Sequence, residues 1–226
     1  MDLLGVLGKN LSVIGTNSLY AYEAAGAGFF RSDITTTTDV DFMWDARTKL
    51  VFAGDTDGLK KEGFLGILKK VDSSFEPIYK RGFRSVNKDG FFVDLVKPAP
   101  PFWKQEQEQM GDQDEIWASE IPSLKWLASC RKFSQMVIGD DGYPAVLVAP
   151  DPRAFALHKL WLSQQPDREP VKKERDRLQS IAVAKLVIEK LPNLQFLESQ
   201  LRAFPLEIIQ EASKSMDDDL PSGFFV

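Results

Sequence analysis

Three aspartates stand inside stretches that are otherwise mainly apolar. Asp39 and Asp41 belong to residues 39–44 (DVDFMW), and Asp94 interrupts residues 91–96 (FFVDLV). The aromatic and β-branched content of both stretches predicts strands, in which alternate side chains share a face. Asp39 and Asp41 should therefore project together. Carboxylates held this close either raise a pKa or recruit a cation, and an all-oxygen ligand set favours magnesium, manganese or calcium.

If the strand of Asp94 lies beside the strand of Asp39 and Asp41, the three carboxylates could hold two divalent ions. Such a pair of ions clamps an in-line phosphoryl displacement. An Asp-x-Asp pair alone is a weak signal, because Asp39 could cap a turn while Asp41 pairs with Arg47. Asp94 is the less common observation, since an unpaired charge inside an apolar strand is unfavourable.

A glycine turn precedes the first acidic strand. The apolar run at residues 11–14 ends at Gly15-Thr16, and the alanine-rich stretch 17–25 follows, which predicts a strand, a tight turn and a helix. Backbone N–H groups at such a turn can bind a phosphate, with the Thr16 and Ser18 hydroxyls as further donors. The turn matches neither G-x-G-x-x-G nor the Walker loop. A purely structural role is the alternative, because glycine after a strand is common.

The chain has one cysteine, Cys130, and one histidine, His158. These counts exclude an intramolecular disulfide and the usual four-ligand Cys/His zinc site. Serine-histidine-acid catalysis would need His158, which lies in a helical stretch without a G-x-S-x-G motif, so ordinary packing is the simpler role. Tryptophans could stack a base, although core packing is the alternative for most of Trp44, Trp103, Trp117, Trp126 and Trp161.

Charge and hydropathy narrow the class of protein further. A formal net charge of −5 argues against a broad basic surface for duplex nucleic acid. Basic side chains do gather within residues 60–88, where solvated helix and hairpin faces are the alternative to a binding patch. No apolar run approaches the roughly 18 to 20 residues of a membrane span, and the first residues lack a signal-peptide pattern. These features predict a cytoplasmic protein without a membrane partner.

The remaining patterns predict an α/β (α+β) fold. A helix is expected at 57–74 and a hairpin of 78–86 with 91–96, followed by a loop or exposed helix at 105–115. A second hairpin of 126–138 with 145–148 is expected to end the sheet. Helices are expected at 151–164, 171–190 and 206–216, the first capped by Asp151 and begun by Pro152. The expected domains are an α/β head, 1–150, and a helical C-terminal subdomain, 151–226.

The order of strand, Gly-Thr turn, helix, Asp-x-Asp strand, helix and Asp strand resembles the DNA-polymerase-β-like nucleotidyltransferase superfamily. That superfamily includes aminoglycoside nucleotidyltransferases and minimal nucleotidyltransferases. More closely, residues 15–23 (GTNSLYAYE), 38–41 (TDVD) and 150–161 (PDPRAFALHKLW) resemble a bacterial branch of nucleotidyltransferase-fold proteins. The resemblance covers about residues 11 to 191. It implies a polymerase-β-like head with a mixed sheet, followed by a helical subdomain.

The resemblance implies roles for particular residues. Asp39 and Asp41 would bind both metals and the triphosphate, while Asp94 would bind one metal and help to deprotonate the attacking hydroxyl. The residues implied in nucleotide binding are Gly15, Thr16 and Ser18 at the turn, and Lys159, Arg168, Lys172 and Asp176 in the helical region. For Lys172 and Asp176, which are four positions apart, the alternative is a surface salt bridge between them.

The implied activity is a metal-dependent nucleotidyl transfer with Mg²⁺ or Mn²⁺. A nucleoside monophosphate would pass from a nucleoside triphosphate, with ATP among the candidates, to an acceptor hydroxyl with release of pyrophosphate. RNA, protein and small molecules all fit as acceptors, and the oligomeric state stays open. The alternatives are a non-catalytic nucleotide-binding or interaction module on the same fold, and a phosphohydrolase. The sequence departs from the superfamily in its Gly-Thr pair and in the 24 positions from Gly15 to Asp39 (39 − 15).

Overall fold

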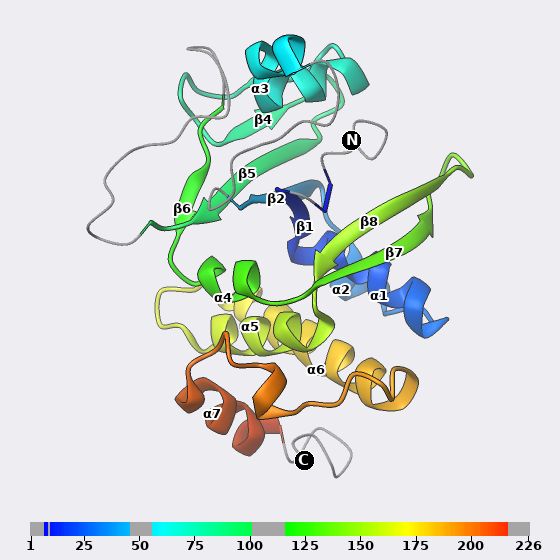
Figure 1. Cartoon of the computed structure of the whole chain (residues 1–226), viewed down its shortest axis with the longest axis vertical. Helices are drawn as coiled ribbons and strands as arrows, with labels where there is room; N and C mark the ends of the chain where they lie inside the picture. The colour runs from blue at the N-terminus through cyan, green and yellow to red at the C-terminus, as the bar shows by residue number, and fades with distance from the viewer. Residues whose placement is uncertain (1–6, 9, 46–55, 101–115, 217–226) are drawn as a thin grey trace. The chain divides into compact units, whose positions relative to one another are not determined.

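The chain folds into two units, and each is built from two separate stretches of sequence. The computed structural model describes residues 7–8, 10–45, 56–100 and 116–216 (Figure 1). The first unit takes in 1–17 and 37–125, and the second takes in 18–36 and 126–226. These bounds follow packing rather than function, so the predicted division into domains at residue 150 stays a prediction.

The first unit contains a mixed sheet. Its strands lie in the order β1, β2, β5, β4, β3, and β6 also pairs with β5. β1 and β4 run antiparallel to their neighbours, whereas β2 and β6 both run parallel to β5. The strand bounds are β1 Leu11–Ile14, β2 Asp39–Trp44, β3 Glu76–Pro77, β4 Arg84–Val86, β5 Phe92–Pro98 and β6 Ser119–Ile121. The predicted mixed sheet with accompanying helices is confirmed.

One face of this sheet is the core of the first unit. Phe42 of β2 and Leu95 of β5 are buried on it, and Phe42 packs edge to face on Phe64, with ring centroids 5.5 Å apart. Phe64 belongs to helix α3, Thr56–Val71, which is interrupted at Gly63 by a φ of 60°. Since strand residues alternate between faces, Asp41 and Asp94 project from the other face.

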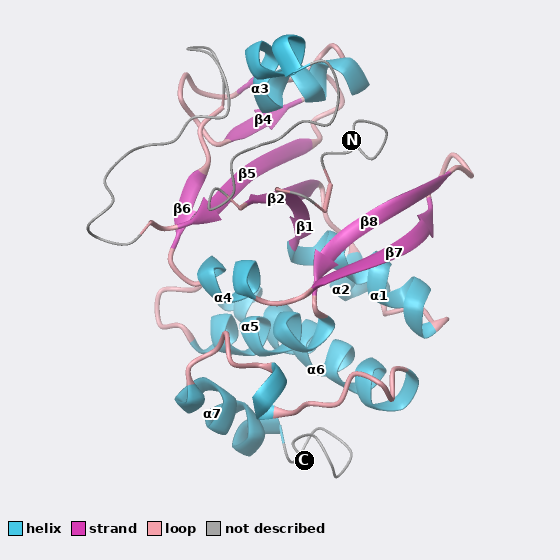
Figure 2. Ribbon diagram, viewed as in Figure 1, coloured by secondary structure: helices cyan, strands magenta, loops and turns pink. Residues whose placement is uncertain are grey.

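The second unit is mainly helical (Figure 2). Helix α5 packs along α6 and also contacts α7, while α1 packs on α6 and on a two-stranded sheet of β7 and β8. The bounds are α1 Leu19–Gly26, α2 Ser32–Thr35, β7 Lys132–Ile138, β8 Pro144–Pro150, α5 Pro152–Gln164, α6 Pro170–Lys190, the 3-10 turn Glu198–Gln200, and α7 Leu206–Met216. The three predicted C-terminal helices are confirmed.

Helix α5 begins as its sequence predicts. The Asp151 carboxylate accepts a hydrogen bond of 2.9 Å from the Arg153 backbone N–H, and Pro152 occupies the first turn. Arg153 also binds this carboxylate through its guanidinium, at 2.7 and 2.9 Å, and both side chains are buried. The cap is therefore also a buried ion pair, which ties the start of α5 to the chain at Gln195, whose carbonyl accepts from Arg153.

Several predicted elements were wrong in extent. The strand predicted at 78–86 is only Arg84–Val86, because Arg81 adopts a left-handed φ of 62° that no strand contains. Residues Leu124–Ser129 form helix α4, so the strand predicted from 126 begins at 132. The second hairpin forms its own sheet and does not end the main one. The segment 105–115 lies outside the described residues, and so does Arg47.

A membrane span was not expected from the sequence. Among the residues that the structure describes, no helix is both long enough and apolar enough to cross a bilayer.

Candidate active site

The parallel pairing of β2 and β5 brings the predicted acids together. Asp41 lies directly opposite Asp94 in the register, and Asp39 lies opposite Phe92, one step along the same face. The neighbouring antiparallel strand β1 places Ile14 opposite Asp41. The end of β1, where the glycine turn starts, therefore meets the acid pair.

Gly15 lies against the carboxylate of Asp41. Its φ is +66°, and a Cβ at this position would lie 2.5 Å from Asp41 Oδ2. The turn therefore requires glycine twice, once for the left-handed backbone and once for the close approach. Residues Gly15–Ser18 form a 3-10 turn ahead of α1. The helix predicted at 17–25 is thus confirmed from Leu19 onward, and its first residues belong to this turn.

Side chains around Asp39 fix its position. The Asn17 side-chain amide donates a hydrogen bond of 2.7 Å to the Asp39 backbone carbonyl, which ties the turn to β2. The Thr37 hydroxyl donates to the Asp39 carboxylate. Ser18, by contrast, is fully buried in the second unit, where it is hydrogen-bonded to the Tyr22 phenol. A phosphate-binding role for Ser18 stays a prediction from the resemblance.

Arg84 completes the acidic face and was missed in the sequence. It lies opposite Asp94 in the β4–β5 register, and its Nε and Nη2 donate to the two Asp94 oxygens at 2.6 Å each. Asp94 is 6% exposed and Arg84 is 38% exposed. The hydrogen bonds to Asp94 and the charge of that carboxylate, followed by the charges of Asp39 and Asp41, raise the pKa of Arg84 above its ordinary value. One cation thus faces three carboxylates.

The donor set fits a hard divalent cation by its chemistry. Asp39, Asp41 and Asp94 offer only carboxylate oxygens, and each Asp94 oxygen keeps a lone pair beside the one that Arg84 uses. In the geometry of the described residues, no group of three or more His, Cys, Asp or Glu side chains gathers closely enough to enclose a metal. The acids are neighbours in the sheet without forming a closed cage.

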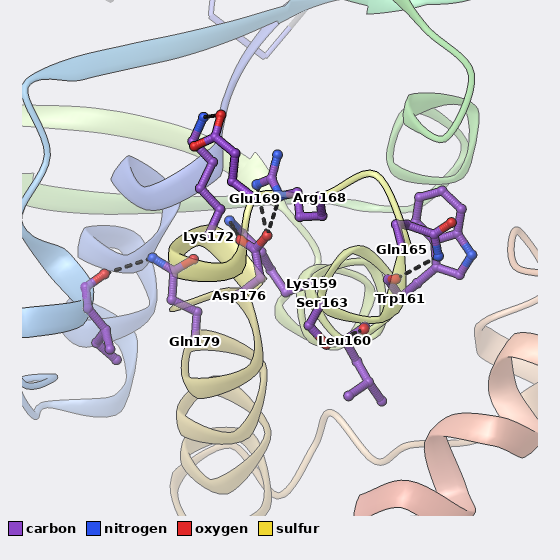
Figure 3. A network of polar contacts seen from close by, with 11 residues as sticks. Lys159, Leu160, Trp161, Ser163, Gln165, Arg168, Glu169, Lys172, Asp176 and Gln179 are labelled. Atoms are coloured by element: carbon purple, nitrogen blue, oxygen red, sulfur yellow. Dashed lines mark hydrogen bonds and ion pairs between the residues drawn. The ribbon is translucent and has the colours of Figure 1, made fainter. Parts of the chain in front are cut away.

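The predicted basic cluster of the helical region is built around Asp176 (Figure 3). This carboxylate, 3% exposed, accepts 2.6 Å from Lys159 Nζ and 2.9 Å from Arg168 Nε, and Arg168 Nη2 lies 2.8 Å away. Lys172 instead pairs with Glu169 at 3.0 Å, at an exposed position. The alternative of a Lys172–Asp176 salt bridge is therefore wrong.

These contacts define what the cluster can do. Lys159 is buried, so it would reach a nucleotide only by leaving Asp176. Arg168 is 31% exposed and binds Asp176 while part of its guanidinium faces outward. The nucleotide-binding roles implied for Lys159, Arg168, Lys172 and Asp176 stay predictions.

His158 and Cys130 are unsuited to acid-base or nucleophilic catalysis. Burial, reinforced by the neighbouring Lys159 charge, lowers the pKa of His158 to about 3. The imidazole stacks on Trp161, with ring centroids 6.2 Å apart. Burial also raises the pKa of the Cys130 thiol to about 12, so the thiolate is scarce at neutral pH. The expectation that His158 packs for ordinary reasons agrees with this environment.

Carboxylates that lie side by side on one face of a sheet can hold divalent cations, and enzymes use such cations to transfer phosphorus-containing groups. Residues 1–204 of the chain match the family described as Nucleotidyltransferase, and the chain belongs to that family. It is accordingly a transferase of phosphorus-containing groups. Neither the curated proteins nor the solved structures with which the chain was compared contain a match.

Proposed function

We propose that the chain transfers a nucleoside monophosphate from a nucleoside triphosphate to an acceptor hydroxyl, with a divalent cation, Mg²⁺ or Mn²⁺, held by Asp39, Asp41 and Asp94. The observation that carries this proposal is the register of β2 and β5, which sets Asp41 opposite Asp94. The turn at Gly15 supports it, because its backbone lies against the same carboxylate. Family membership supports nucleotidyl transfer in general.

In the proposed reaction the acceptor oxygen attacks the α-phosphorus while the bond from that phosphorus to the bridging α,β oxygen breaks. Pyrophosphate leaves, and the acceptor proton passes to a free lone pair of Asp94. A bound divalent cation would offset the negative charge on the phosphate oxygens. Arg84 holds Asp94 in one orientation through two hydrogen bonds, which fixes where that lone pair points. Gly15 and Thr16 would contact the phosphates from the turn.

The test is label transfer from α-labelled nucleoside triphosphates in the presence of magnesium and a cell extract separated into RNA, protein and small molecules. We expect label in one fraction with the wild type, and a loss of 100-fold or more, on the order of a removed catalytic group, with Asp41→Asn and Asp94→Asn. Asp89→Asn is the matched control, because Asp89 is exposed in the β4–β5 turn. Equal labelling by wild type and Asp41→Asn would contradict the proposal.

A second candidate is a non-catalytic nucleotide-binding module. The two hydrogen bonds from Arg84 favour it, since they occupy one lone pair on each Asp94 oxygen. This candidate predicts magnesium-dependent binding of a nucleoside triphosphate with no label transferred to any fraction. Release of free phosphate without an acceptor product would instead indicate a phosphohydrolase.

A further inference from the structure

The main sheet of the first unit has a notch on one side of β5. Val96 of β5 pairs with Met43 of β2 along one edge of β5 and with Ser119 of β6 along the other. Strand β6 therefore lies along the same edge of β5 as β4. β4 pairs only with residues 92–94. The segment that precedes β4 therefore diverges from β5, and β6 pairs with the next part of β5 on that side (Figure 1).

A cavity of ≈ 290 Å³ lies in this notch. Residues Arg81, Gly82 and Phe83 line it from the β4 side, Trp117 to Glu120 line it from the β6 side, and Lys97 lines it from β5. A hydrogen bond of 2.9 Å from the Trp117 backbone N–H to the Gly82 carbonyl joins the two sides. The notch is thus a built feature of the sheet.

A buried cation lines the cavity. Lys97 is 7% exposed, and its ammonium lies 3.3 Å from Glu120 and over the ring of Trp44. An ammonium has three N–H donors, so one ion pair leaves capacity unused. The indole N–H groups of Trp117 and Trp44 are buried, and no described residue accepts a hydrogen bond from either.

Arg81 adds a second cation at the rim. Its guanidinium carbon lies 5.3 Å from the centroid of the Trp117 ring, and no carboxylate among the described residues pairs with it. The backbone of Arg81 is left-handed, with a φ of 62°, inside a turn that a hydrogen bond of 2.8 Å from the Gly82 N–H to the Tyr79 carbonyl closes. An arginine and a buried lysine thus line one cavity, and Glu120 is the one carboxylate among its described lining residues.

We propose that this notch binds the oxyanion group, phosphate or carboxylate, of a small molecule. Two cations against the one carboxylate of the described lining residues favour an anion. The cavity exceeds the volume of a bare phosphate, so the ligand carries a small organic body that packs against Phe83 and Trp117.

The site is distinct from the acidic face. Lys97 follows Asp94 by three positions on β5, and an odd separation on a strand puts two side chains on opposite faces. Anion binding should therefore need neither a divalent cation nor the three aspartates. The inference does not depend on the proposed function, and the two can fail separately.

The experiment follows the side-chain indole N–H signals of the full chain by ¹H–¹⁵N NMR in the presence of EDTA. The chain has five tryptophans, and Trp117→Phe assigns the signal of interest. The probes are phenyl phosphate for the phosphate source and benzoate for the carboxylate source, with benzyl alcohol as the neutral match. We expect at least one of the two anions to shift the Trp117 signal saturably, in the wild type and in Asp41→Asn, and benzyl alcohol to leave it unchanged.

Variants locate the site. Lys97→Met keeps the length of the side chain and should weaken anion binding at least about tenfold, the effect of one charged hydrogen bond. Arg81→Gly removes the other cation at a position whose φ suits glycine, so we expect this variant to fold. It should weaken anion binding about fivefold or more, as for a partly exposed charged contact. Lys88→Met removes an exposed lysine in the β4–β5 turn and should leave binding unchanged.

Three results would overturn the proposal. The first is the absence of any saturable shift with either anion, and the second is an equal shift with benzyl alcohol, which would mean an apolar site. The third is an unchanged anion affinity in both Arg81→Gly and Lys97→Met. If Lys97→Met does not fold, the affinity of Arg81→Gly decides alone.

Discussion

At the scale of single residues, Gly15 decides how closely the turn can approach the acids. Two demands coincide there, a φ of +66° and only 2.5 Å between an added Cβ and Asp41 Oδ2. Gly90 has a similar φ of +78° with nothing within 4 Å of an added Cβ. The two glycines therefore separate the cost of the backbone conformation from the cost of the contact.

We expect Gly90→Ala to lower the free energy of unfolding by about 1 kcal/mol, the cost of a left-handed backbone. Gly15→Ala should lower it by about 3 kcal/mol, because the new methyl group must also displace the Asp41 carboxylate. Urea denaturation of both variants measures the difference. Equal losses of unfolding free energy in the two variants would mean that the Asp41 side chain moves aside at no cost, and that the turn does not fix its position.

At the scale of elements, the hairpin of β4 and β5 decides which side chains share the acidic face. The Asn87 backbone N–H donates to the Phe91 carbonyl, and Gly90 is left-handed, so the loop has three residues, Lys88 to Gly90. This closure sets Arg84 opposite Asp94. Taking residues 87–90 as the loop would pair Arg84 with Val93 and put the arginine on the other face.

A double-mutant cycle tests this pairing. We expect Arg84→Gln and Asp94→Asn together to lower the free energy of unfolding by less than the sum of the single changes, with a coupling of about 1 to 2 kcal/mol. Lys88→Gln in place of Arg84→Gln is the control and should show no coupling. Additive losses from the first pair would mean that the register differs from the one described.

The sequence predicted the elements that carry long, consistent patterns. β2 was predicted with its exact bounds and α5 with its cap, since each has its own local signal. The pairing of Arg84 was missed because a shift of one residue in a loop changes every face after it. Helix α4 was taken for a strand because a short apolar run fits either element. Trp126 is instead helical, where it packs against Trp161 with ring centroids 5.0 Å apart.

At the scale of the whole molecule, the long spacing between the glycine turn and the acids has a structural explanation. Residues 18–36, which contain α1 and α2, belong to the second unit, whereas Gly15 and Asp39 belong to the first. Most of the 24-position separation (39 − 15) is therefore chain that belongs to another folded unit, and it is not an extended loop. Within the second unit, Gln179 of α6 anchors this excursion by donating 2.7 Å to the Ile34 carbonyl.

The stability of the chain between pH 5 and 7 should depend on one side chain. His158 is the single histidine, and no other type of side chain ordinarily titrates in this range. Burial, followed by the charge of Lys159, lowers the pKa of His158 from 6.5 to about 3. Below pH 6.5 the unfolded chain therefore binds a proton that the folded chain does not, and stability falls as the pH falls.

Linkage gives the size of this effect as about 2 kcal/mol of unfolding free energy lost between pH 7 and pH 5. Urea denaturation at several pH values measures it. His158→Gln changes the stability at every pH, because Trp161 loses its stacked partner, but it should remove most of the slope. The decisive quantity is therefore the slope of unfolding free energy against pH. An equal slope in the wild type and in His158→Gln would mean that His158 is protonated in the folded state. That result would contradict its burial between Trp126 and Trp161.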